Sequence, residues 1–446
     1  MNRHKAALVV WGIAVAVYAV AVAGRTSFGV AGLSAIDRFN ITAATLSLFT
    51  IVQVGVYAVA QLPVGLLLDR FGARMLLGCG AMILAVGQVG MAFADTVGWA
   101  LVARFLIGLG DATAFTSVIR LVPSWFSPRR APLITQLTGI VGGFGQFISS
   151  LPFAFALAHV GWAPAFSALS VIGVVAAAAA FGVIRDAPGG GVTGDAAESG
   201  DVVTQAHPTI GDTLREPATW LGFWTHWTCN FPLTVFTLLW GVPFLQIHNG
   251  YGPAVASALL VVITGSGMVF GPLIGELTAR HRLRRVWLVN AAAIMVLLAW
   301  GAVIILPAPA PGWLTILLLL TISFAGPASS IGFDFSRTAI PVSRLGTANG
   351  VINTGGFIAS LMSAGLIGLV LDWSAAGQPF SAGDFKIAMS TQLLAWAIGM
   401  LNIEIYRRRV RKNDAAHGIV VPSLAEVAAR YRSRARGNTR GGGCGL

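Results

Sequence analysis

Four ionisable side chains lie deep inside long apolar stretches of this sequence: Arg25, Arg104, Asp111 and His226. Such a group costs at least about 2.5–3.5 kcal/mol to place in hydrocarbon, so each of them needs a partner or a water-filled cavity. An arginine presents a fixed positive charge to an anion, an aspartate can exchange a proton, and a histidine titrates near physiological pH. The chemistry that these residue types predict is ionic binding and proton exchange.

The spacing of Arg104 and Asp111 brings both to one face of a helix, because they are seven positions apart, which is two turns. We expect Arg25 and Arg104 to present positive charge to a cavity. Asp111 then exchanges a proton or pairs with one of the arginines. The alternative is a buried structural pair, in which Asp111 and an arginine hold two helices together.

His226 lies in the most polar and aromatic stretch of the second half of the chain. Asn230 follows it by about one helical turn, and further side chains that can contact a solute surround it: Trp224, Thr225, Trp227 and Thr228. This pattern predicts a substrate contact at His226 and Asn230. A neutral histidine that is hydrogen-bonded between two helices explains it equally well, so both interpretations stay open.

Composition indicates what kind of scaffold holds these side chains. Of the 446 residues, 56% are hydrophobic and 10% are charged, and the mean hydropathy is +0.77. Soluble domains do not have such a composition, so we predict a polytopic membrane protein. The three cysteines, Cys79, Cys229 and Cys444, are scattered along the chain and predict neither a disulfide framework nor a metal site.

Twelve apolar segments are long enough to cross a bilayer, since roughly 20 helical residues span the hydrocarbon. The first of them is too long for the core of a signal peptide. The predicted spans are 6–30, 46–68, 75–93, 99–123, 133–157, 164–184, 220–245, 255–277, 286–306, 313–333, 348–371 and 387–406.

Two segments lie outside these spans. Residues 185–216 are rich in glycine, threonine and acidic residues, which predicts a flexible linker between two six-helix halves, 6–184 and 217–406. Residues 407–446 form a basic tail, in which Ser423 and Glu426 have the spacing of a capping box at the start of a short helix.

The distribution of lysine and arginine predicts the orientation. With the amino terminus in the cytoplasm, both termini and most basic loops lie inside, and the opposite loops hold only Arg38 and Lys386. The formal net charge of +12 is then a signal of topology, so nucleic-acid binding is not expected. We expect a multi-pass protein of the plasma or inner membrane whose basic tail lies beside anionic lipid.

Residues 65–74 carry the most specific motif, Gly-x-Leu-x-Asp-Arg-x-Gly-x-Arg, between the second and third spans. It resembles the loop at this place in the major facilitator superfamily (MFS) of secondary transporters. In that family the loop is a latch, which holds the two halves together on the inner side in one state and releases them in the other. The resemblance implies a latch formed by Gly65, Asp69, Arg70, Gly72 and Arg74, with candidate partners at other helix ends: Arg120, Asp334, Arg337 and Arg344.

The loop after the eighth span repeats this motif roughly 210 residues later, with alanine in the place of Asp69: Gly275, Ala279, Arg280 and Arg284. The latch is therefore expected to be asymmetric. The stretch from Arg104 to Ala112 resembles the arginine and glycine signature of the family's fourth helix, where the arginine is linked to proton coupling. Helices one, four, seven and ten line the central cavity in this family, and the four deep residues fall on three of them.

The resemblance implies an all-α membrane protein of the MFS fold, with twelve transmembrane helices in two pseudo-symmetric six-helix bundles. We expect a monomeric secondary transporter that moves a small anionic or zwitterionic solute by alternating access, coupled to protons and without a cofactor or metal. The direction of transport is open.

The sequence disfavours three other functions. Proton-driven export of a drug or metabolite is disfavoured because helix five lacks the glycine and proline signature of drug antiporters; the first proline after its glycines is Pro152. A membrane sensor without transport would need a signalling domain, and the tail is too short for one. An enzyme is not expected, because the sequence shows no nucleophile with a base, no metal-ligand cluster and no phosphate loop.

Overall fold

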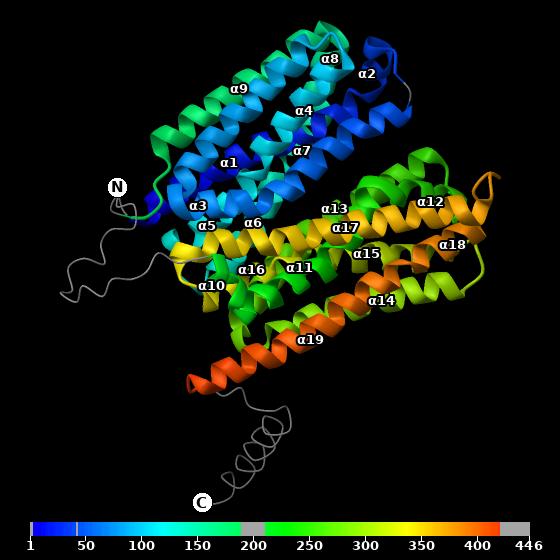
Figure 1. Ribbon diagram of the computed structural model, residues 1–446. Helices are drawn as coiled ribbons and strands as arrows, with labels where there is room; N and C mark the ends of the chain where they lie inside the picture. Colours follow the sequence, from blue (N-terminus) through cyan, green and yellow to red (C-terminus); the bar gives the residue numbers. More distant parts are fainter. Residues whose placement is uncertain (1–2, 42, 189–209, 420–446) are drawn as a thin grey trace, which may run out of the picture.

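The computed structural model describes residues 3–41, 43–188 and 210–419, and Figure 1 shows two bundles of long helices. No strand occurs within those ranges. The middle of the predicted linker, 189–209, lies outside the described residues. So do the predicted capping box at Ser423 and Glu426, and Cys444.

The first half of the chain forms the upper bundle in Figure 1. Its helices are α1 (Arg3–Val30), α2 (Gly32–Phe39), α3 (Ala43–Phe93), α4 (Val97–Ala112), α5 (Ala114–Trp125), α6 (Ala131–Gly143), α7 (Gly145–Ile148), a π-helical turn (Ser149–Phe153), α8 (Ala154–Val160) and α9 (Trp162–Val183).

The second half forms the lower bundle. Its helices are α10 (Ile210–Arg215), α11 (Pro217–Val235), a π-helical turn (Phe236–Trp240), α12 (Gly241–Ile247), α13 (Pro253–Arg280), α14 (Arg285–Ile305), α15 (Gly312–Ser329), α16 (Ile331–Ala339), α17 (Leu345–Ala375), α18 (Ala382–Ser390) and α19 (Gln392–Ala416), with single 3-10 turns at Arg282–Arg284 and Val342–Arg344.

These helices confirm the predicted twelve-helix architecture. Ten stretches within the described ranges are long and apolar enough to cross a membrane. One of them, 51–93, contains two passes, because Gly72 takes φ 78° and ψ 169° and reverses the chain there. That conformation is accessible essentially to glycine alone. The consecutive helices α18 and α19 form the twelfth pass.

Two segments are more helical than the sequence predicts. The last helix does not end near Tyr406 but continues to Ala416, so the first part of the basic tail belongs to α19. Glu404 stabilises this extension by pairing with Arg407 and Arg408, at 2.6 and 2.8 Å, one turn further on. The end of the predicted linker is also helical, since residues 210–215 form α10.

Corresponding helices of the two bundles are broken at matching places. The fourth pass changes from α4 to α5 at Thr113, and the tenth changes from α15 to α16 at Ser330. Asp111 lies two residues before the first break. The breaks are therefore a structural counterpart of the duplicated sequence, and the first one positions a buried carboxylate.

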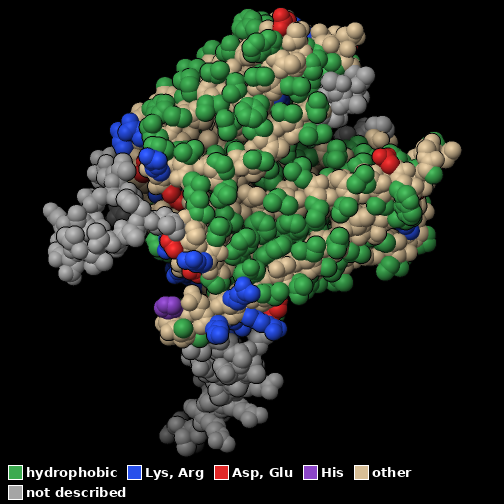
Figure 2. Space-filling model, viewed as in Figure 1, with side chains coloured by type: hydrophobic (Ala, Val, Ile, Leu, Met, Phe, Trp, Pro, Cys, Tyr) green, Lys and Arg blue, Asp and Glu red, His purple; other side chains and the backbone are tan. Residues whose placement is uncertain are grey.

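Figure 2 shows large apolar side chains over the outside of both bundles. Exposed residues of this kind include Val59 (78% exposed) and Ile305 (82% exposed). Such a surface is expected against lipid. Lysine and arginine gather at the left of this view, around loops 70–74, 127–130 and 280–285 and the end of α19. We call this the basic end, and we call the opposite end, which holds α2, α12 and α18, the far end.

Candidate substrate and proton site and candidate latch

Arg25 of α1 and Asp111 of α4 form an ion pair inside the first bundle, with 3.2 Å between Nη1 and Oδ2. The Asp111 side chain is fully buried, whereas that of Arg25 is 28% exposed. An entering anion therefore meets the guanidinium of Arg25 before it meets the carboxylate. The pair also joins α1 to α4, as the structural alternative predicts.

Asp111 keeps one oxygen without a partner. Its Oδ1 is buried and accepts no hydrogen bond. The surrounding helices lie very close together, since a Cβ added to the preceding Gly110 would be 2.5 Å from the backbone oxygen of Gly80. A buried acceptor without a donor costs about 1–3 kcal/mol, and more when it is charged. Its pairing with Arg25 offsets part of this cost.

Arg104 lies beside this pair and is 2% exposed. Its Nη2 donates to the backbone oxygen of Arg25, at 3.3 Å, and to Oε1 of Gln53. The guanidinium carbon is 4.7 Å from the centre of the Phe28 ring. The Nε and Nη1 atoms are buried and have no acceptor. In this structure α3 and α1 cover Arg104, so its contact with a cavity stays a prediction.

The cluster of Arg25, Arg104 and Asp111 carries a net positive charge of one, because two guanidinium groups share a single carboxylate. Two donor nitrogens of Arg104, Nε and Nη1, remain unused. A guanidinium with free donors matches the planar pair of oxygens in a carboxylate. An oxyanion is therefore the kind of ligand that would neutralise this cluster.

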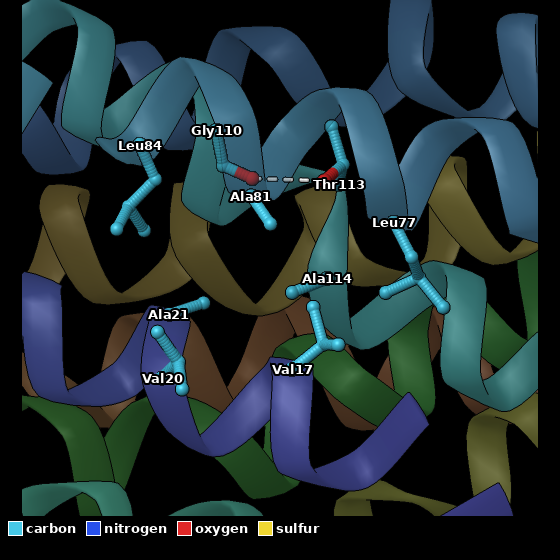
Figure 3. A pocket seen from close by; sticks show the side chains of 9 residues that line it. All are labelled: Val17, Val20, Ala21, Leu77, Ala81, Leu84, Gly110, Thr113 and Ala114. Atoms are coloured by element: carbon cyan, nitrogen blue, oxygen red, sulfur yellow. Dashed lines mark hydrogen bonds between the residues drawn. The ribbon is translucent and has the colours of Figure 1, made fainter. Parts of the chain in front are cut away.

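A small void next to this cluster is apolar. Figure 3 shows the side chains that line it from three neighbouring passes: Val17, Val20, Ala21, Leu77, Ala81, Leu84, Gly110, Thr113 and Ala114. The Thr113 hydroxyl donates to the backbone oxygen of Gly110 at 2.8 Å, so it offers no free donor. A void without polar partners stays dry. It therefore provides neither a binding site for an anion nor a water path to Asp111.

Three polar side chains of α3 that the sequence analysis missed also belong to this region: Gln53, Tyr57 and Gln61. The guanidinium carbon of Arg25 lies 5.6 Å from the centre of the Tyr57 ring. Gln61 donates to the backbone oxygen of Ala112 at 3.4 Å. The three residues recur every four positions within an apolar span, which places neighbours on one helix face. That spacing is the signal that could have found them.

His226 and Asn230 lie on α11 in the second bundle, whereas the arginine cluster lies in the first. His226 is 5% exposed, and its Nδ1 lies 3.3 Å from the backbone oxygen of Ser329. It therefore joins α11 to α15, which is the geometry of the alternative interpretation. Asn230 is half-buried and donates to the Thr234 hydroxyl on its own helix at 3.2 Å. A substrate contact at either residue stays a prediction.

At the basic end, Asp69 of α3 reaches across to the second bundle. It accepts hydrogen bonds from the backbone amides of Gly346 and Thr347, both at 2.7 Å, and from the Thr347 hydroxyl at 2.6 Å. These amides belong to the first turn of α17. They have no partner within the helix, and the positive end of the helix dipole also attracts a carboxylate. Asp69 thus caps a helix of the other bundle.

Glycines allow the two helices to approach closely at this contact. A Cβ added to Gly65 would lie 2.7 Å from the backbone oxygen of Gly346. One added to Gly350 would collide with the backbone oxygen of Gln61. The seam between α3 and α17 therefore has no room for side chains at these positions.

Most arginines of the predicted latch stay within the first bundle. Arg70 lies over the ring of Phe71, its neighbour in sequence, at 5.2 Å, and Arg74 donates to the backbone oxygen of Phe181 at 2.9 Å. The Arg120 Nε atom lies 3.8 Å from Asp69 Oδ1, also within this bundle. The predicted partner Arg120 thus pairs with Asp69 within the first bundle, while across the bundles Asp69 bonds to α17. An ionic latch between the two halves stays a prediction.

Arg337 of the second bundle reaches the interface. Arg337 pairs with Asp334 of the same helix and also donates to the hydroxyl of Thr135 in α6, at 2.7 Å. Arg280 pairs with Glu276 on its own helix at 2.6 Å. Arg284, the second arginine predicted from the repeated motif, is half-buried in the turn before α14.

These contacts between the bundles lie in the half of the molecule nearest the basic end. There α13 also approaches α6, since a Cβ added to Gly275 would be 2.9 Å from Cα of Leu133. The two bundles therefore meet at the basic end. At the far end, Figure 2 shows the surface indented between the two bundles.

Two bundles of six membrane-spanning helices, with buried charges beside their interface, define a membrane transporter. The sequence model of the Major Facilitator Superfamily matches residues 14–364. The chain belongs to this superfamily, as the loop motif predicts, and it is a multi-pass transporter rather than an enzyme.

Several relatives are bacterial transporters. The chain is 31% identical over 151 residues to the uncharacterized transporter YybO of Bacillus subtilis, a match that covers 34% of this chain and 35% of YybO. It is 23% identical to the probable galactarate/D-glucarate transporter GudP of the same organism, over 71% of this chain and 75% of GudP. It is 24% identical to the probable sulfoacetate transporter SauU of Cupriavidus necator, over 83% of this chain and 89% of SauU.

Among solved structures, the proton:xylose symporter XylE bound to 6-bromo-6-deoxy-D-glucose shares the fold, with a TM-score of 0.64. The match covers 88% of this chain and 95% of XylE at 14% sequence identity. At that identity the likeness concerns the fold alone.

Proposed function

We propose that this protein is a proton-coupled transporter of a small organic anion that carries a carboxylate or a similar oxyanion. The observation that carries the proposal is the buried cluster of Arg25, Arg104 and Asp111. Asp111 pairs with Arg25 there, Arg104 lies beside the pair, and two donor nitrogens of Arg104 have no acceptor. This excess of positive charge attracts an oxyanion.

The Arg25–Asp111 pair supplies the coupling in this proposal. A solute oxyanion and the Asp111 carboxylate compete for one guanidinium. When the solute binds Arg25, Asp111 loses its counter-ion in a buried place, and taking up a proton removes the cost of that unpaired charge. One proton then accompanies one negative charge. The loaded site keeps the net charge of the empty site, so transport of a monoanion is electroneutral.

The names of the relatives favour the same substrate class. GudP is described as a probable transporter of galactarate and D-glucarate, and SauU of sulfoacetate. We therefore place organic acids ahead of zwitterions and cationic drugs as candidate substrates of this chain.

We further propose that the basic end faces the cytoplasm and that Asp69 holds it closed. Most lysines and arginines of the loops gather at this end, in agreement with the positive-inside rule. The structure then represents an outward-open state of alternating access. The Asp69 side chain is 14% exposed, so water can replace part of its hydrogen bonding when the bundles separate.

The test is proton flux into liposomes that contain the purified protein and a trapped pH dye. External galactarate, D-glucarate, sulfoacetate, a neutral sugar and a cationic drug are added in turn to the wild type, Asp111→Asn and Asp95→Asn. The control residue Asp95 is exposed at the far end. We expect an organic acid to acidify the lumen with the wild type and the control, and not with Asp111→Asn.

Two outcomes would contradict the proposal. If the acids cross the bilayer without proton movement in the wild type, the protein is a facilitator or uses another ion. If Asp111→Asn retains full proton flux, Asp111 is only the structural partner of Arg25.

A further inference from the structure

Asn353 of α17 connects the two bundles next to the arginine cluster. Its Nδ2 donates to the Tyr57 hydroxyl at 3.2 Å and to Oε1 of Gln61 at 2.8 Å. Asn353 is 2% exposed, Tyr57 is 5% exposed and Gln61 is fully buried. Because water cannot replace a lost partner there, breaking these hydrogen bonds has a larger cost than breaking exposed ones.

Tyr57 contacts both the arginine cluster and the second bundle. The face of its ring lies near the Arg25 guanidinium, while the ring centre is 4.6 Å from that of Phe357 on α17. A cation beside an aromatic face attracts the ring, and the attraction depends on where the cation lies. The position of Tyr57 therefore depends on Arg25 on one side and on α17 on the other.

Below Tyr57, contacts between the same two helices continue to the latch. Gln61, Gly65 and Asp69 follow at steps of four residues along α3 and meet α17 at successive turns. Tyr57 and Asn353 thus form the end of this seam that is nearest to the Arg25–Asp111 pair.

We propose that Tyr57 and Asn353 form a coupling junction, which transmits the state of the Arg25–Asp111 pair to the seam between α3 and α17. When Arg25 leaves its place beside the ring, Tyr57 shifts, its hydroxyl separates from Asn353, and α17 is released from α3. Tyr57 and Asn353 act through Arg25 and the latch, so they are positioning residues. The inference rests on the proposed role of the Arg25–Asp111 pair.

The test is a double-mutant cycle that needs no substrate. Spin labels on cysteines introduced at Ser127 and His281, both exposed at the basic end, report by double electron–electron resonance whether that end is closed or open. The native cysteines are replaced by serine. Asp111→Asn, which mimics the protonated carboxyl group, is measured alone and combined with Asn353→Ala or Tyr57→Phe.

We expect Asp111→Asn alone to change the ratio of closed to open molecules about fivefold, the effect of one net hydrogen bond. In the Asn353→Ala and Tyr57→Phe backgrounds the change falls below about twofold. Tyr57→Phe keeps the ring and removes only the hydroxyl, so it serves as the second variant if Asn353→Ala does not fold.

Asn349→Ala is the matched control. Asn349 is also buried, one turn earlier on α17, but it bonds to Ser336 within the second bundle at 3.1 Å. Asp111→Asn should keep its full effect in this background. The proposal would be overturned if Asp111→Asn changed the ratio of closed to open molecules equally in all backgrounds. It would also be overturned if Asp111→Asn had no effect in the parent protein, or if its effect disappeared in the Asn349→Ala background. Because no solute is added, a failure to find proton-coupled anion transport would not affect this readout.

Discussion

Asp69→Asn tests the latch most directly, because this change keeps the shape of the side chain and removes its charge. In the closed basic end, the carboxylate accepts three hydrogen bonds from the first turn of α17. An asparagine keeps one oxygen acceptor, and its amide nitrogen cannot accept from the remaining donors. We therefore expect the basic end to open more often.

The size of the effect follows from these contacts. A hydrogen bond to a charged group contributes about 1.5–3 kcal/mol, and a carboxylate at a helix N-terminus gains about 0.3–1 kcal/mol from the dipole. One hydrogen bond is retained in weaker form, and the site is partly solvated. The closed state should lose about 2–3 kcal/mol, so the ratio of closed to open molecules should fall about 30- to 140-fold.

The spin-label pair at positions 127 and 281 measures this ratio from the two distance populations. Arg70→Gln is the matched control, because Arg70 is the next residue and contacts Phe71 within its own bundle. We expect Arg70→Gln to change the ratio of closed to open molecules less than about twofold, because an exposed charge usually contributes little to stability. A shift of less than about threefold in Asp69→Asn, or an equal shift in Arg70→Gln, would refute the assignment of the latch to the carboxylate.

Three further predictions concern single residues. Gly65→Ala should open the basic end in the same distance measurement, because its Cβ would lie 2.7 Å from the backbone oxygen of Gly346; Gly12→Ala, with nothing within 4 Å, should not. Gly72→Ala should lower the free energy of unfolding by about 1–3 kcal/mol, since φ is 78°, and the thermal midpoint should fall relative to Gly12→Ala. His226→Gln should leave the ratio of transport rates at low and high pH within about twofold of the wild-type ratio, because this histidine is hydrogen-bonded between helices. A loss of the pH dependence would make His226 a proton site.

The spans could be predicted because the bilayer imposes a length and a composition on each of them. The same argument singled out Arg25, Arg104 and Asp111, since a charge in hydrocarbon needs an explanation whatever the fold. Hydropathy does not tell which groups pair. The ion pair between Arg25 and Asp111, and the burial of Arg104 against Gln53, depend on how α1, α3 and α4 pack.

At the basic end, the latch likewise has bonding partners that the sequence does not identify. The motif of residues 65–74 identifies Asp69 and its arginines, but the groups that Asp69 binds are backbone amides of Gly346 and Thr347. Every helix begins with such amides, so no residue type marks them in a sequence. Arg120, a charged side chain that the sequence does show, pairs with Asp69 within the first bundle.

The sequence by itself determined the membrane class, the twelve passes, the duplicated halves and the set of charges that the membrane interior must accommodate. Each of these follows from the cost of placing polar groups in lipid, which acts residue by residue along the chain. The tertiary structure decided which charges are paired, which end is closed, and that Tyr57 and Asn353 meet across the bundles. These depend on contacts between helices that are hundreds of residues apart, and side-chain and backbone geometry at close range selects them.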